Sequence, residues 1–324
     1  MSITATTKKL DAVTLLDSKW RLRDNLLKGY FSNSIDALSF YEFSARIAQL
    51  PLIGRPYKKV LNLYYRYIHT NSLVFPLKDI EEIIKSAAHI YVDPCTCRLA
   101  AGEKACNAPL FVCMRINRAA EIRKMQEDSE GLSKDDALAV MRNARKYNLV
   151  FSLESCIQPY QYQICACCSD CCVAMRMRYR YGLDAYQSGP YLPEFGPKDC
   201  KQCSACIDKC PVHALSVVGG KPVVDLKTCF GCGICAEICP KNSIEMVMHE
   251  DRLRKDEEPG AIRLFISVMF IYLMMFPAFA AHRLITGSRM NRLKTAAPIQ
   301  SDLYHEGMQK RKMAEAQHEN TDHH

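Results

Sequence analysis

Apolar residues recur at helical spacing through much of the N-terminal half of the chain. In the clearest case, residues 77–89, they fall on one helical face: Leu77, Ile80, Ile83, Ile84, Ala87 and Ala88. Similar spacing predicts helices over residues 11–31, 34–50, 56–70, 115–128 and 133–147. Ser133 and Asp136 have the spacing of an N-terminal cap for the last of these helices. Residues 148–153 form a short strand-like run.

The hydropathy of the chain changes abruptly after residue 248. A charged linker, residues 249–258, is followed by residues 264–281, a run of eighteen residues without a charge. That length meets the threshold for a bilayer span, about 18 to 20 residues. A buried core helix is the alternative, but no comparable apolar segment elsewhere in the chain offers it a partner. The pattern therefore predicts a transmembrane helix over residues 261–284, followed by a polar tail over residues 285–324.

Eight of the 18 cysteines stand in two copies of one spacing, C-x2-C-x2-C-x3-C-P. A tight loop with three thiolates at x2 spacings can wrap the irons of a cubane, while the fourth cysteine leads away from it. Zinc sites usually show two separated C-x2-C pairs instead, and a disulfide scaffold is the other alternative. The spacing favours iron–sulfur ligation. The motif cysteines are Cys200, Cys203, Cys206 and Cys210, then Cys229, Cys232, Cys235 and Cys239.

The residues between and after these motifs predict short strands. Residues 214–218 and 221–224 flank Gly219-Gly220, which is the pattern of a β-hairpin with a two-residue turn. Residues 243–247 form a matching strand after the second motif.

With these motifs and strands, residues 195–248 resemble the bacterial-type ferredoxin domain, which has two pseudosymmetric halves. The resemblance implies two 4Fe-4S clusters and one-electron transfer, with the fourth cysteine of each motif ligating the other cluster. It assigns one cluster to Cys200, Cys203, Cys206 and Cys239. It assigns the second cluster to Cys229, Cys232, Cys235 and Cys210.

Two further cysteine groups precede these motifs. One contains Cys95, Cys97, Cys106 and Cys113, and the other contains Cys165, Cys167, Cys168, Cys171 and Cys172, with Cys156 shortly before it. The first group is compatible with an iron–sulfur cluster, a zinc site or unliganded buried thiols. The density of the second group favours metal or cluster ligation over free or redox-active thiols.

The order of these groups resembles a group of large ferredoxin-like proteins from anaerobic and sulfur- or methane-cycling microbes. The likeness covers residues 75–248 and implies electron transfer but little about a substrate. In such sequences Asn often follows the first cysteine of the dense motif, whereas this chain has Ala166.

A short basic segment follows the dense group. Arg176, Arg178 and Arg180 alternate with other residues, and they favour either a docking ridge for an acidic partner or anionic lipid, or a solvated face.

Composition adds limits on partners and location. The formal net charge of +8 favours anionic partners or a membrane surface, without pointing to nucleic acid. The sequence contains no G-x-G-x-x-G and no Walker A motif, so we expect no nucleotide cofactor. Residues 1–9 are polar, unlike a signal peptide, and so many thiols suit metal ligation in a reducing cytoplasm.

The sequence as a whole predicts an α+β protein with a transmembrane helix over residues 261–284. Ahead of that helix we expect a helical N-terminal region (1–90), a Cys-rich region with additional cluster or zinc sites (91–190) and the two-cluster ferredoxin domain (191–250). The corresponding function is a membrane-anchored electron-transfer subunit that serves redox partner proteins, with its cluster domains on the cytoplasmic side. The alternatives are a reductase with a catalytic Cys165–Cys172 centre and a thiol-based redox sensor.

Overall fold

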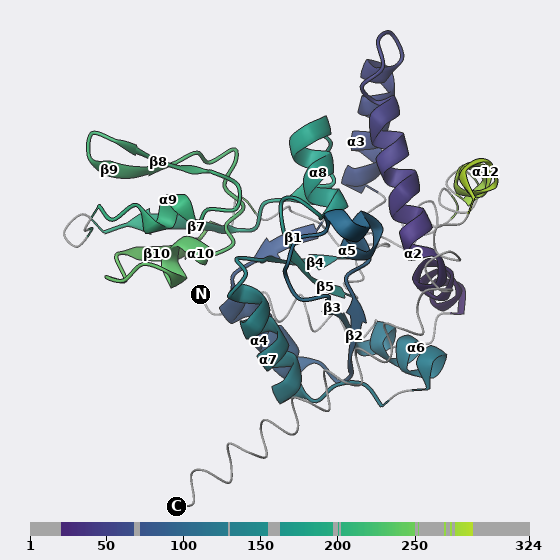
Figure 1. The fold of residues 1–324 in the computed structure, drawn as a ribbon, viewed down its shortest axis with the longest axis horizontal. Coiled ribbons are helices and arrows are strands. Elements are labelled where there is room, and N and C mark those ends of the chain that lie inside the picture. Colours follow the sequence, from purple (N-terminus) through teal and green to yellow (C-terminus); the bar gives the residue numbers. More distant parts are fainter. Residues whose placement is uncertain are drawn as a thin grey trace, which may run out of the picture.

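The fold is that of a computed structural model, shown in Figure 1. It describes residues 21–67, 72–128, 130–154, 163–196, 200, 202–249, 252, 269, 273 and 276–287. Three predicted features lie outside the described residues: the first part (11–20) of the helix predicted over residues 11–31, Cys156, and most of the predicted polar tail.

A six-stranded mixed sheet forms the centre of the larger part of the molecule (Figure 1). Its strand order is β2-β3-β5-β4-β1-β6, and every neighbouring pair is antiparallel except β1 and β6. The strands are β1 (Ser72–Phe75), β2 (Ile90–Pro94), β3 (Phe111–Ile116), β4 (Val150–Glu154), β5 (Gln163–Cys167) and β6 (Tyr186–Gln187).

The predicted fold class is wrong in two respects, and this sheet is the first. Mixed α/β structure built on a multi-stranded sheet replaces the predicted series of a helical region and a Cys-rich region. The strands are short, and β1 pairs with β4 across a long sequence separation, with Leu73 opposite Leu153. Such pairing leaves little periodic signal in the sequence, so of the six strands in this sheet only β4 was predicted.

The predicted helices are confirmed where the structure describes them, with shifted ends. The predicted break between residues 31 and 34 is a kink at Asn33 within one long helix. The helix expected from residue 115 begins at Asn117, because Arg115 belongs to β3. The helices around the sheet are α2 (Arg21–Ile47), α3 (Gly54–Tyr67), α4 (Leu77–Ser86), α5 (Thr96–Ala101), α6 (Asn117–Glu127), α7 (Lys134–Arg145) and α8 (Val173–Tyr181), with a 3₁₀ turn at Gly102–Lys104.

The Ser133 cap of α7 is confirmed, and it gives a stability prediction. The Ser133 hydroxyl accepts a hydrogen bond from the Asp136 backbone N–H at 3.1 Å. Ser133→Ala is expected to lower the free energy of unfolding by about 1 kcal/mol, because it leaves an N-terminal N–H unpaired. Thermal denaturation measures this change. Ser133→Thr keeps a capping hydroxyl, so a Ser133→Thr protein as unstable as Ser133→Ala contradicts the explanation.

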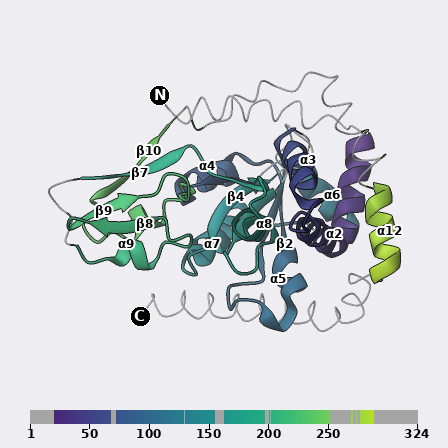
Figure 2. The same cartoon turned by 90° about the horizontal axis from the view of Figure 1, so that it is seen from above.

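The remaining strands lie at one end of the molecule, opposite α2 (Figure 2). The predicted hairpin is confirmed: β8 (Leu215–Val218) pairs with β9 (Lys221–Val224), and both turn glycines have positive φ. The predicted strand after the second motif is β10 (Ile244–Met248), which pairs antiparallel with β7 (Tyr191–Phe195). Two short helices, α9 (Ala205–Asp208) and α10 (Ile234–Glu237), complete this end.

One buried core connects the sheet with this second end. Phe151 and Tyr186 on the sheet belong to the same apolar cluster as Phe230 and Ile234 from the motif region. The Tyr186 and Phe230 rings lie with their centroids 5.0 Å apart. The two parts of the molecule therefore share one apolar core.

The predicted transmembrane helix is the second error in the fold class. Within the residues that the structure describes, none of the helices combines the length and the apolar character that a bilayer span requires. Of the predicted span, residues 276–284 belong to α12 (Phe276–Thr286), and most of residues 261–275 lie outside the described part.

Helix α12 packs against α2. Phe279 meets the Phe40 ring edge to face, and the buried His282 lies 5.0 Å from the Phe43 ring. Arg283 forms an ion pair at 3.4 Å with Asp36, which is buried. The apolar residues of α12 thus cover part of α2. The sequence alone did not identify α2 as a packing partner for this apolar segment.

Candidate metal centres

The eight motif cysteines gather around two separate cavities. One cavity, of about 30 Å³, is lined by Cys200, Cys203, Cys206 and Cys239. The other, of about 20 Å³, is lined by Cys210, Cys229, Cys232 and Cys235. We call these the first and the second quartet. Each quartet takes three thiols from one motif and the fourth from the other motif.

The loops that carry these thiols have the same backbone in both motifs. Positive φ angles occur at Gln202 and Ser204 in the first motif and at Gly231 and Gly233 at the equivalent places in the second. These residues alternate with the cysteines, so the chain curls and presents successive thiols to one centre. The short helices α9 and α10 then lead to the fourth cysteines, Cys210 and Cys239.

The second quartet is the more buried of the two. Cys229 is buried, whereas Cys200 and Cys203 are exposed. Burial raises the pKa of the Cys232 thiol to about 11, and the Arg145 guanidinium opposes that rise. A bound cation would favour the deprotonated form of Cys232, as it does for thiolates at metal sites generally.

Arg145 reaches this quartet from α7 in the sheet domain. It donates a hydrogen bond to the Cys232 carbonyl at 3.2 Å and forms an ion pair with Glu237 at 3.0 Å. Its guanidinium also lies over the Phe151 ring, 4.4 Å from the centroid. A positive charge is therefore fixed next to the second quartet by contacts on both sides of it.

The structure regroups the nine upstream cysteines that it describes. Sequence order placed Cys95, Cys97, Cys106 and Cys113 together, and Cys165 to Cys172 together. In the fold, six of the nine form a closed ring in which each thiol interacts with two neighbours. The order around this thiol ring is Cys95, Cys97, Cys172, Cys167, Cys165 and Cys113.

Local structure explains how the thiol ring forms. Cys165 and Cys167 are two residues apart on β5, so both project from the same face of the sheet. Cys113 lies on β3, which pairs with β5. Hydrogen bonding with the thiols of Cys113 and Cys97 lowers the pKa of Cys95. The thiols thus lie close enough to perturb one another.

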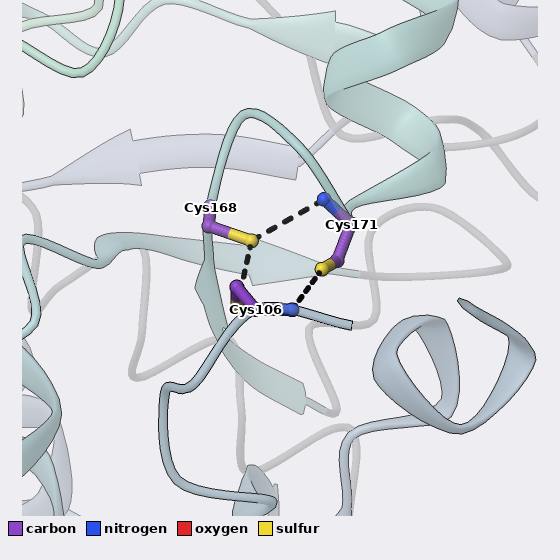
Figure 3. A group of neighbouring side chains, drawn as sticks. All are labelled: Cys106, Cys168 and Cys171. Atoms are coloured by element: carbon purple, nitrogen blue, oxygen red, sulfur yellow. Dashed lines mark hydrogen bonds between the residues drawn. The ribbon is translucent and has the colours of Figure 1, made fainter. Parts of the chain in front are cut away.

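The remaining three cysteines form a compact outer triad, Cys106, Cys168 and Cys171 (Figure 3). The Cys106 and Cys168 sulfurs are 3.4 Å apart. The Cys106 N–H donates to the Cys171 sulfur at 3.2 Å, and the Cys171 N–H donates to the Cys168 sulfur at 3.3 Å. The three sulfurs lie within 4.8 Å of one another. This spacing suits a single metal ion.

A cavity of about 70 Å³ lies between the thiol ring and the outer triad, lined by every one of the nine upstream thiols except Cys106. Its polar lining includes Arg98 and Gln163, which are only 3% and 6% exposed, together with Glu154, Thr96, Tyr41 and Tyr65. Arg98 donates to the Cys106 sulfur at 3.3 Å. Among the described residues, Arg98 Nη1 and Gln163 Oε1 have no hydrogen-bond partner.

The basic segment after the dense group is occupied by internal contacts. On α8, Arg176 forms an ion pair with Glu42 at 3.1 Å. Arg178 donates to the Tyr186 carbonyl at 2.7 Å and lies 4.9 Å from the centre of the Phe230 ring. Only Arg180 is exposed. Arg176 thus joins α8 to α2, and Arg178 joins α8 to the iron–sulfur end of the molecule. Both alternatives drawn from the sequence, a docking ridge and a solvated face, left out these internal contacts.

A comparison with protein families identifies part of the chain. The model described as the LdpA Fe-S cluster-binding domain matches residues 196–250, which contain all eight motif cysteines. Residues 196–250 form an iron–sulfur cluster-binding domain. The thiol ring and the outer triad lie outside the matched residues. A comparison with curated proteins found no match to the chain.

Sequence reasoning missed several residues of these sites. Arg145 gave no signal, because it lies on a helix far from the motif cysteines in the sequence. No pattern in the sequence marked Tyr186 or Gln163 either. Gly231 and Gly233 were visible between the cysteines of the second motif, and the positive φ that such a curled loop needs was a usable signal.

Proposed function

We propose that this protein transfers single electrons through two 4Fe-4S clusters, one held by the first quartet and one by the second. Each cluster takes four thiolate ligands, and its irons accept or release one electron without a change in the bonds of the protein. The electrons pass to and from redox partner proteins.

The grouping of the thiols carries this proposal. Each cavity is lined by four motif cysteines, and each quartet borrows its fourth member from the other motif. Crossed ligation of this kind is the arrangement of two-cluster ferredoxins. The matched iron–sulfur domain spans both quartets.

Exposure gives the two clusters different roles in the proposal. Cys200 and Cys203 are exposed, so a partner protein can approach the first cluster closely. The second quartet faces the sheet domain, with Arg145 on one side and Phe230 in its cavity lining. Electrons therefore enter or leave at the first cluster, and the second cluster connects it with the interior.

Metal and sulfide analysis of anaerobically purified full-length protein tests the proposal. We expect at least about eight irons and about eight acid-labile sulfides per chain, together with EPR signals of reduced 4Fe-4S clusters. Stoichiometric zinc with fewer than about four irons per chain is the result that overturns it.

Arg145 gives a prediction about reduction potentials. Arg145→Leu is expected to lower the potential of the second cluster, because the positive charge that favours the reduced, more negative cluster is removed. A shift of tens of millivolts is reasonable, since a unit charge about 10 Å away at an effective dielectric constant of about 20 contributes roughly 1–2 kcal/mol. Redox titration followed by EPR measures the shift.

Two internal controls accompany this titration. Arg145 is absent from the residues that line the first cavity, so the potential of the first cluster should stay constant. Arg145→Lys keeps the charge and should shift the second potential much less than Arg145→Leu. Equal shifts in the two variants mean that packing, rather than charge, sets the potential.

A further inference from the structure

The thiol ring presents a density of sulfur that packing does not require. Five of its six thiols are buried, and all six are free of disulfide bonds. They come from the start of α5, β3, β5 and the start of α8, so four separate elements converge on one cavity. A small apolar side chain fills such positions equally well, and the convergence therefore points to a ligand.

The buried guanidinium of Arg98 points to the charge of that ligand. Arg98 lines the cavity, and its Nη1 donor has no partner among the described residues. A buried guanidinium N–H needs an acceptor, because leaving it unpaired is costly. Gln163 already donates to the Cys165 sulfur through its Nε2. Donors directed at sulfur suit an anionic thiolate–metal centre.

The spacing of the thiols distinguishes a cluster from a single ion. A tetrahedral zinc with Zn–S bonds of about 2.3 Å holds its four sulfurs roughly 3.8 Å from one another. Among the described residues, only the outer triad forms such a compact group, within 4.8 Å. The thiol ring is more open, as are the two quartets of the iron–sulfur domain. An open arrangement of thiols leaves room for several irons and their sulfides.

The position of the thiol ring connects it with the second quartet. Tyr186, which is fully buried, belongs to the same core cluster as Cys167 and Cys172 of the ring. Its ring lies 5.0 Å from that of Phe230, which is 1% exposed and lines the cavity of the second quartet. Two aromatic rings in van der Waals range thus bridge the two sulfur sites within one dry core.

We propose that four of the six ring thiols hold an additional iron–sulfur cluster, which exchanges single electrons with the second quartet's cluster across Tyr186 and Phe230. In each transfer one cluster loses an electron and the other gains it, with no bond or proton changing place. The electron exchange rests on the function proposed above, whereas the additional cluster does not.

The test begins with the unaltered full-length protein. Purified without oxygen, it is expected to contain about twelve irons and about twelve acid-labile sulfides, since three 4Fe-4S clusters hold four of each. A count of about eight irons overturns the additional cluster, with or without zinc present. This measurement needs no variant, so it decides the matter even if altered proteins fail to fold.

A pair of matched triple variants then locates the cluster. Replacing Cys165, Cys167 and Cys172 by alanine leaves three ring thiols, too few for the cluster, and is expected to remove about four irons. Replacing Cys106, Cys168 and Cys171 by alanine removes as many thiols beside the same cavity and is expected to leave the iron count unchanged. If the outer-triad variant loses iron and the ring variant does not, the assignment of the cluster to the thiol ring is overturned.

The same samples separate this proposal from the proposed function. If the ring variant loses about four irons while the EPR signals of two ferredoxin-type clusters persist, both proposals stand. If the unaltered protein lacks those two signals but loses iron in the ring variant, the two-cluster function fails and the additional cluster stands. A redox titration should show one reduction step fewer in the ring variant, and an unchanged titration overturns the electron exchange.

Discussion

Replacing Gly231 by alanine is expected to abolish binding of the cluster in the second quartet. Gly231 lies between Cys229 and Cys232 and has φ of +74°, which costs about 1–3 kcal/mol for a residue with a side chain. An added Cβ would also lie far inside van der Waals contact with the Tyr191 carbonyl oxygen. The loop then has to move, and the thiols that flank it move with it.

Gly219→Ala is the matched control for this change. Gly219 also has positive φ, +59°, but an added Cβ meets no atom within 4 Å. It therefore reports the cost of the backbone conformation without the collision. We expect Gly219→Ala to keep its full iron content and Gly231→Ala to lose about four irons per chain. Equal iron contents in the two variants mean that the Tyr191 contact does not fix the loop.

The second large effect is expected from Cys210→Ala. Cys210 belongs to the first motif in the sequence but lines the cavity of the second quartet. Its removal should therefore release the cluster held by Cys229, Cys232 and Cys235 and leave the first cluster in place. Alkylation under anaerobic conditions, followed by mass spectrometry of peptides, shows which cysteines lose protection by iron.

The reciprocal variant completes this experiment. Cys239→Ala should expose Cys200, Cys203 and Cys206 to alkylation, because Cys239 lines the first cavity. If each variant exposes the cysteines of its own motif instead, the crossed grouping of the quartets does not describe the bound clusters.

The motif region was predictable because its signals are local. The C-x2-C spacing fixes loop curvature within a few residues, and Gly219-Gly220 fixes the turn between β8 and β9. Ser133 likewise acts within its own turn of α7. The grouping into quartets joins cysteines that are far apart in the sequence, and it was expected only from the resemblance to the bacterial-type ferredoxin domain.

The sheet and the thiol ring depend on contacts between distant segments. Cys113 and Cys165 become neighbours only because β3 pairs with β5, and no periodicity in either strand specifies that pairing. Arg176 illustrates the same limit, since its partner Glu42 lies on α2 and cannot be inferred from the basic run itself. The apolar run near the C-terminus was misjudged for this reason too: α12 has its partner in α2.

The pairing of β7 with β10 affects where this iron–sulfur domain can be divided from the rest of the chain. The family match begins at residue 196, yet β10 pairs along its whole length with Tyr191–Phe195, and Gly189 donates to the Phe230 carbonyl at 2.8 Å. A recombinant fragment that begins at residue 196 exposes an unpaired strand edge, which favours aggregation. Engineers who transplant this domain into another electron carrier should therefore retain the chain from Gly189 onward.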